Sequence, residues 1–122
     1  MPGILVIDDS EVIRKLLSDY LTELGYAVDL AADGQEGVEM ALESDYQMVF
    51  CDIHMPKKNG WEVYQEVSKM KPSLPFVMTD SLPDELAKLA QESGARRCLR
   101  KPFDLSEVRE TVEQILSPAK MR

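Results

Sequence analysis

Apolar runs and helix-like segments alternate five times along the chain. Short apolar runs, which are typical of buried strands, occur at residues 4–8, 27–31, 46–51, 74–79 and 97–100. After each run, apolar residues recur every three or four positions, which is the spacing of an amphipathic helix. The chain therefore predicts five successive strand–helix units.

Residues with capping preferences mark the ends of the predicted helices. Ser10 is a suitable N-cap for the first helix, which should end at Gly25. Asn59 and Glu62 have the spacing of a capping box before the third helix. The other predicted boundaries are Gly34 for the second helix, Ser81, Pro83 and Gly94 for the fourth, and Asp104, Glu107 and Pro118 for the fifth.

The alternation of strands and helices predicts an α/β fold. Strands that are apolar along their whole length suit a parallel sheet with helices on both faces. Right-handed crossovers then give a doubly wound open sheet, because five strands are too few for a closed eight-stranded barrel. With no repeat or linker in the sequence, we expect a single domain over residues 1–122 with a core at about residues 3–117.

The composition is that of a globular protein, with 44% hydrophobic and 30% charged residues among 122. No apolar run approaches the roughly 20 residues of a membrane helix, and the N-terminus has no signal-peptide pattern, so we expect a cytoplasmic protein with no membrane contact. A formal net charge of −8 argues against direct nucleic-acid binding. Cys51 and Cys98 lie in apolar runs without metal or redox spacing, which predicts buried, unreactive thiols.

Polar side chains stand where the predicted strands end, the edge at which open α/β sheets bind ligands. They are Asp8 and Asp9, Asp52, Thr79, and Arg100 with Lys101. Each has an ordinary alternative: the first two acids can cap the first helix, the threonine can simply end a strand, and most lysines are surface residues. Asp52 is different, because a carboxylate that ends a buried run needs compensation. Their convergence at one edge favours a functional site.

Three clustered carboxylates repel one another unless a cation joins them. Oxygen ligands without cysteine or clustered histidine favour Mg²⁺, and the glycine-rich phosphate loops of nucleotide-binding folds are absent. A carboxylate can attack phosphorus and form an aspartyl phosphate, assisted by a lysine and a hydroxyl. His54, the only histidine, is not required as a base, since Asp52 should be ionised near neutral pH.

The ordered set “IDDS”, “DIHMPKKNG”, the threonine after the fourth run and “KPF” resembles the receiver domain of two-component response regulators. The resemblance covers essentially the whole chain, which is similar in size to single-domain chemotaxis regulators. It implies a flavodoxin-like (βα)5 sandwich with strand order 2-1-3-4-5. It also implies that Asp52 is the phosphoacceptor, that the donor is a phosphohistidine of a histidine kinase or histidine phosphotransfer protein, and that the chain is a switch rather than an enzyme, at most catalysing its own phosphorylation and dephosphorylation.

The same resemblance implies an ion site. Asp9 and Asp52 would bind Mg²⁺ directly, Asp8 through water, and His54 through its backbone carbonyl. Lys101 would pair with the phosphoryl group and precede a cis Lys101–Pro102 peptide.

Thr79 is implied to be the switch hydroxyl, which moves toward the phosphoryl group. The surface of the fourth helix, fifth strand and fifth helix would change and control an output protein or domain. The first helix would dock the kinase, and the chain would be a monomer or a phosphorylation-dependent homodimer.

Three residues depart from the family pattern. Cys98 replaces the aromatic partner of the switch hydroxyl, so either Thr79 couples to the output surface differently or the coupling is weaker. We expect coupling through backbone movement of the loop from Thr79 to Pro83. Asp80 replaces a small residue, and should repel the phosphodonor or pair with Lys101 or Arg100, which predicts slow labelling by acetyl phosphate. Lys58 stands where an apolar residue is common. His54 and Ser81 occupy variable positions that flank the phosphoryl group.

Two other functions are compatible with parts of the sequence. A phosphatase of the haloacid dehalogenase type also uses an aspartate nucleophile, but it needs a second aspartate where His54 stands, and a cap domain. A docking module that works without phosphorylation would explain Cys98 and Asp80. The intact set of acids, Thr79 and Lys101 favours phosphorylation.

Overall fold

The computed structural model describes residues 3–81 and 85–116 as five strands and five helices in alternation. The strands are β1 (Ile4–Ile7), β2 (Val28–Ala31), β3 (Met48–Asp52), β4 (Phe76–Asp80) and β5 (Arg97–Arg100). The helices are α1 (Glu11–Glu23), α2 (Gly34–Glu43), α3 (Gly60–Met70), α4 (Glu85–Glu92) and α5 (Leu105–Leu116). The predicted boundaries at Pro83 and Pro118, and the end of the expected core at residue 117, lie outside the described residues.

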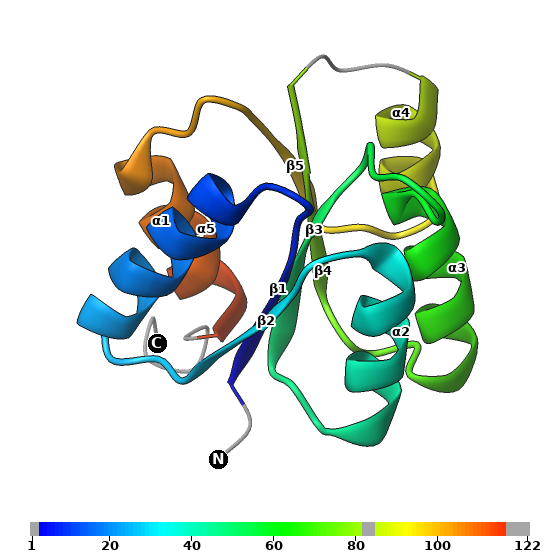
Figure 1. The fold of residues 1–122 in the computed structure, drawn as a ribbon, viewed down its shortest axis with the longest axis horizontal. Helices are drawn as coiled ribbons and strands as arrows, with labels where there is room; N and C mark the ends of the chain where they lie inside the picture. Colours follow the sequence, from blue (N-terminus) through cyan, green and yellow to red (C-terminus); the bar gives the residue numbers. More distant parts are fainter. Residues whose placement is uncertain (1–2, 82–84, 117–122) are drawn as a thin grey trace.

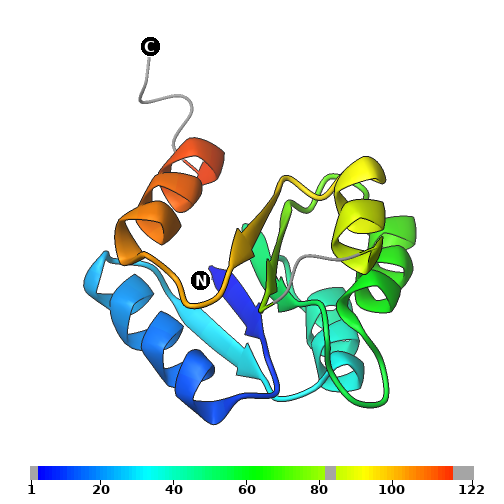
Figure 2. The same cartoon turned by 90° about the horizontal axis from the view of Figure 1, so that it is seen from above.

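All strand pairs are parallel, and the sheet order is β2-β1-β3-β4-β5. Helices α1 and α5 cover one face of the sheet, whereas α2, α3 and α4 cover the other (Figures 1 and 2). This arrangement confirms the predicted doubly wound, flavodoxin-like α/β fold. Within the described ranges, no helix has both the length and the apolar character that crossing a membrane requires.

Alternate residues of each central strand enter opposite halves of the core. In β3, Val49 and Cys51 belong to the cluster that includes residues of α2, α3 and α4, whereas Met48 and Phe50 belong to the cluster that includes residues of α1 and α5. Both faces of the strand are therefore buried, which is why it is apolar without interruption. Burying a large side chain such as Phe50 contributes about 1.5–3 kcal/mol.

Most predicted helix ends are confirmed. The Ser10 side chain accepts a hydrogen bond from the backbone N–H of Ile13, and Asn59 with Glu62 forms a complete capping box. Gly25 and Gly94 follow α1 and α4 with φ angles of 100° and 125°, which a side chain would disfavour.

The predicted role of Glu107 in capping α5 is wrong. Asp104 does hold the first turn, because its carboxylate accepts hydrogen bonds from the backbone and hydroxyl of Ser106. The Glu107 carboxylate instead contacts Arg97 of β5, with Nη2 and Oε2 3.1 Å apart. The carboxylate thus pairs with a cation on β5, although Glu107 lies in the first turn of α5.

Strands β3 and β4 begin and end later than the apolar runs predicted. Pro75 precedes β4, and Asp52 and Asp80 lie inside strands rather than beyond them. The reason is that the hydrogen bonds of the sheet continue past the apolar residues: the Ile53 N–H donates to the Thr79 carbonyl at 2.9 Å. The polar side chains are therefore held by rigid backbone.

Candidate functional site

The parallel sheet brings three carboxylates together at its carboxyl edge. Asp8 directly follows β1, and Asp52 is the last residue of β3, the strand that pairs with β1. One carboxylate oxygen each from Asp8, Asp9 and Asp52 lies within 4.8 Å of the other two. Asp8 is 1% exposed and Asp52 5% exposed, whereas Asp9 is exposed to solvent. The site is thus a largely buried cluster of acids that solvent reaches at Asp9, and we call this cluster the pocket.

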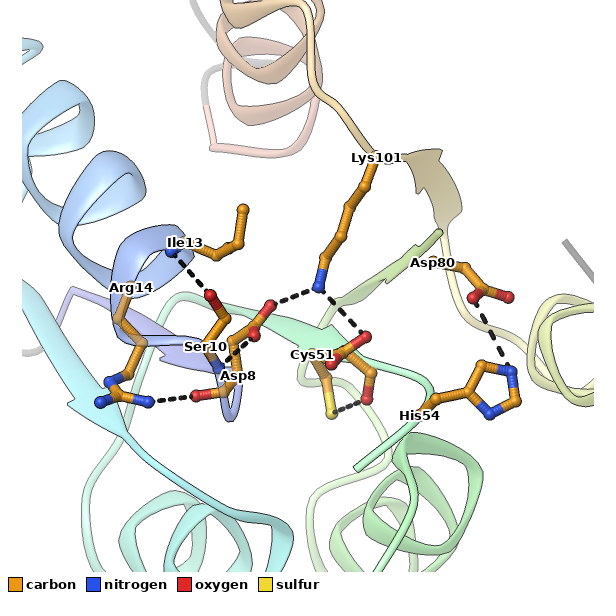
Figure 3. A network of polar contacts seen from close by, with 9 residues as sticks. Asp8, Ser10, Ile13, Arg14, Cys51, His54, Asp80 and Lys101 are labelled. Carbon is orange, nitrogen blue, oxygen red and sulfur yellow. Dashed lines mark hydrogen bonds and ion pairs between the residues drawn. The ribbon is translucent and has the colours of Figure 1, made fainter. Parts of the chain in front are cut away.

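Lys101, just beyond β5, places its ammonium group in this pocket (Figure 3). Its Nζ lies 2.9 Å from Oδ2 of Asp8 and 3.4 Å from Oδ1 of Asp52. The peptide between Lys101 and Pro102 is cis, as the family resemblance implied. The backbone N–H of Lys101 also donates to the carbonyl of Asp80 at 2.8 Å, which anchors the residue to β4.

The pocket changes the acidity of its two central groups. Burial, followed by repulsion from Asp8, raises the pKa of Asp52 to about 7, because the attraction of Lys101 only partly opposes these effects. Burial alone would lower the pKa of Lys101, but contacts with Asp8 and Asp52 outweigh burial and raise it. The expectation that Asp52 is fully ionised near neutral pH is therefore wrong when only the protein's own charges act. A bound cation would restore its negative charge.

Asp8 serves both the helix and the pocket. Its Oδ1 accepts a hydrogen bond of 2.8 Å from the backbone N–H of Ser10, and its carbonyl accepts one of 2.7 Å from Nη1 of Arg14. Asp8 thus holds the turn that precedes α1 and also lies in the cluster of acids. Sequence reasoning missed Arg14, although its position four residues after the N-cap, on the same side of the first turn, was a usable signal.

The donor set fits a magnesium ion. All the candidate side-chain ligands are carboxylate oxygens, which a hard divalent cation prefers. The buried Oδ2 of Asp8 accepts no hydrogen bond of acceptable geometry, although the Lys101 ammonium lies 2.9 Å away. A buried oxygen with spare acceptor capacity among three acids is what a cation site requires.

His54 and Asp80 form a second pair beside the pocket (Figure 3). Nε2 of His54 lies 3.7 Å from Oδ1 of Asp80, whose side chain is 1% exposed while that of His54 is 51% exposed. The predicted pairing of Asp80 with Lys101 or Arg100 is wrong, because the Lys101 ammonium is taken up by Asp8 and Asp52. The contact was not visible in the sequence because it joins the loop after β3 to the last residue of β4, 26 positions further along the chain.

Thr79 lies beside Asp52, its partner in the β3–β4 register, and is 2% exposed. Cys98 of β5 pairs in register with Met78 and packs, partly buried, against the core under α2, α3 and α4. Cys51 is fully buried. Among the described residues neither cysteine forms a disulfide.

The loop after β3 is tightly packed against the site. An added Cβ at Gly60 would lie 2.4 Å from the carbonyl oxygen of Asp52, so only glycine fits without displacing the backbone. Lys57 has a φ angle of 71°, and the Lys58 N–H donates to the Pro56 carbonyl across it. The Lys58 ammonium contacts Glu66 of α3, which explains how a lysine is accommodated there.

Comparison with known proteins identifies similar chains. The model of the response regulator receiver domain matches residues 4–113. The transcriptional regulatory protein HprR of Escherichia coli is 35% identical over 107 residues, which cover 86% of this chain and 47% of HprR. The sensor histidine kinase RcsC of the same organism is 32% identical over 110 residues, 89% of this chain and 12% of RcsC.

A solved structure shares the fold. The response regulator protein TrrA from Thermotoga maritima, in complex with Mg²⁺ and BeF, has a TM-score of 0.87 and 33% identity, covering 95% of this chain and 100% of that one. The chain spans about half the length of the curated transcriptional regulators that it matches.

Proposed function

Because the chain belongs to the response regulator receiver domain family, we propose that Asp52 accepts a phosphoryl group from a phosphohistidine of a sensor histidine kinase or histidine phosphotransfer protein. The observation that carries this proposal is the buried Asp52 carboxylate, with the Lys101 ammonium 3.4 Å away and two further acids beside it. The kinase relative RcsC and the regulator relative HprR are consistent with a role between a kinase and an output.

Residues of the pocket would also hold Mg²⁺. Asp8, Asp9 and Asp52 would supply carboxylate oxygens and His54 a backbone carbonyl. When bound, the ion would neutralise charge on the phosphoryl oxygens and on the acids. The structure of TrrA with Mg²⁺ and BeF supports this assignment.

The chemistry needs little from the protein beyond positioning. An Asp52 oxygen attacks phosphorus while the P–N bond of the phosphohistidine breaks, and the electron pair of that bond goes to the ring nitrogen. The imidazole leaves as a neutral group because its other nitrogen carries a proton. Lys101 then pairs with a phosphoryl oxygen, and Thr79, adjacent in the register, donates its hydroxyl hydrogen bond.

Phosphorylation would alter the surface formed by α4, β5 and α5. The new charge draws Lys101 from its contact with Asp8 and draws Thr79 toward Asp52. Since Cys98 provides no aromatic ring to move, the change is transmitted by the backbone that follows Thr79. Backbone amide shifts on adding beryllofluoride, which stands in for the phosphoryl group, should then extend beyond the pocket into β5 and α5. Shifts confined to the pocket would refute this route.

Phosphorylation itself is tested with phosphoramidate and Mg²⁺. We expect mass spectrometry to show the addition of one phosphoryl group to the wild-type protein and none to Asp52→Asn. Steady hydrolysis of p-nitrophenyl phosphate would instead indicate a phosphatase.

The only residues that favour a docking module without phosphorylation are Cys98 and Asp80, which depart from the family pattern. It predicts that Asp52→Asn keeps full partner binding.

A further inference from the structure

Asp80 is a buried carboxylate at the edge of the proposed phosphoryl-accepting site, and the proposed reaction does not use it. It is the last residue of β4 and follows Thr79, which pairs in register with Asp52. Its side chain is 1% exposed, and its Oδ1 lies 3.7 Å from Nε2 of His54, which follows Asp52 by two residues. The backbone of Asp80 is also fixed, since its carbonyl accepts the Lys101 N–H.

The position of Asp80 adds negative charge to the side of the pocket away from Asp8. In Figure 3, Asp8 and Asp80 lie on opposite sides of Lys101. The Lys101 ammonium lies 2.9 Å from Asp8 and 3.4 Å from Asp52, so these two acids engage the cation before any phosphodonor arrives. An incoming phosphoryl group therefore meets a carboxylate on each side.

We propose that Asp80 makes the site select phosphodonors by charge, disfavouring small dianionic acyl phosphates relative to phosphoramidate-type donors such as a protein phosphohistidine. This inference rests on the proposed function. Like charges that meet in a partly buried pocket repel more strongly than in water, since the surroundings are less polarisable. The repulsion acts on the approach of the donor, so it lowers the rate of labelling.

Two small donors distinguish charge from chemistry because both give the same product. With acetyl phosphate, the P–O bond breaks and acetate leaves with the electron pair. With phosphoramidate, the P–N bond breaks and ammonia leaves, its nitrogen already carrying the protons. Phosphoramidate has less negative charge at neutral pH because that nitrogen is protonated. For each donor, we therefore compare the labelling rate of the variant with that of the wild-type protein, and in this ratio the contribution of the leaving group cancels.

The test measures labelling rates by mass spectrometry with Mg²⁺ present. Asp80→Asn keeps the size of the side chain and removes its charge. We expect labelling by acetyl phosphate to increase about tenfold, and labelling by phosphoramidate to increase less than about threefold. The matched control, Glu110→Gln, removes one charge from an exposed position on α5 and should change neither rate by more than about twofold.

Equal acceleration of both donors, or no acceleration, would overturn the inference. If the wild-type protein is labelled by neither donor, the proposed function fails as well, so the two failures are distinguishable. Asp80→Ala is a second uncharged variant, for use where Asp80→Asn does not fold. It should also accelerate labelling by acetyl phosphate more than labelling by phosphoramidate, and an equal effect on both donors would refute the inference.

Discussion

Replacing Asp52 with asparagine should stabilise the protein at neutral pH when no divalent cation is bound. The wild-type carboxyl group has a pKa raised to about 7 by burial and by Asp8, from an ordinary value of 3.8. Between these values the folded state binds more protons than the unfolded state, so the free energy of unfolding falls as pH rises. Asparagine has no charge to desolvate, so the variant avoids this loss.

The size of the effect follows from the shift. A change from 3.8 to about 7 corresponds to about 4 kcal/mol above pH 7, at about 1.36 kcal/mol per pH unit. The gain in the variant is smaller, because Lys101 loses one of its two carboxylate partners. We therefore expect Asp52→Asn to unfold with a free energy about 2 kcal/mol higher at about pH 7.5, and to differ little from wild type near pH 4.

Urea unfolding in EDTA, followed by the fluorescence of Trp61, the single tryptophan, measures this difference. A gain of about 2 kcal/mol moves the midpoint by about 1 M urea. Exposed Glu110→Gln is the control and should leave the midpoint unchanged. Mg²⁺ should narrow the gap, because it binds the wild-type acids better and stabilises that folded state. A variant that is less stable than wild type at about pH 7.5, or a gain that does not depend on pH, would refute the reasoning.

Two further predictions concern residues around the site and at the far end of the sheet. Gly60→Ala should lower the free energy of unfolding by about 1–3 kcal/mol and weaken Mg²⁺ binding, since the added Cβ would lie 2.4 Å from the Asp52 carbonyl oxygen. The control Gly25→Ala, whose added Cβ meets no atom within 4 Å, should lower stability without changing Mg²⁺ affinity. Equal Mg²⁺ affinities in the two variants would contradict the steric argument. Burial and the hydrogen bond to Asp29 raise the pKa of Tyr46 to about 12. In Asp29→Asn this pKa should fall toward the ordinary value of 10.0, as measured by an ultraviolet titration from which that of Tyr46→Phe is subtracted. An unchanged pKa would exclude Asp29 as a cause.

The amino-acid sequence by itself determined the fold and the membership of the acidic cluster. Apolar runs and helical spacing depend only on consecutive residues, so the alternation of strands and helices was correct, as was the capping box of Asn59 and Glu62. Parallel strands have their carboxyl ends at one edge, so Asp8, Asp9 and Asp52 had to converge once the sheet formed.

Only the tertiary structure decided how the charges pair and how strongly burial acts on them. The Glu107 carboxylate contacts Arg97 rather than capping α5, and Asp80 lies against His54 rather than Lys101. The raised pKa of Asp52 was likewise not predicted. Electrostatic energy depends on distances between atoms and on access to water. Both quantities are set by how separate elements pack, which the order of residues along one strand does not contain.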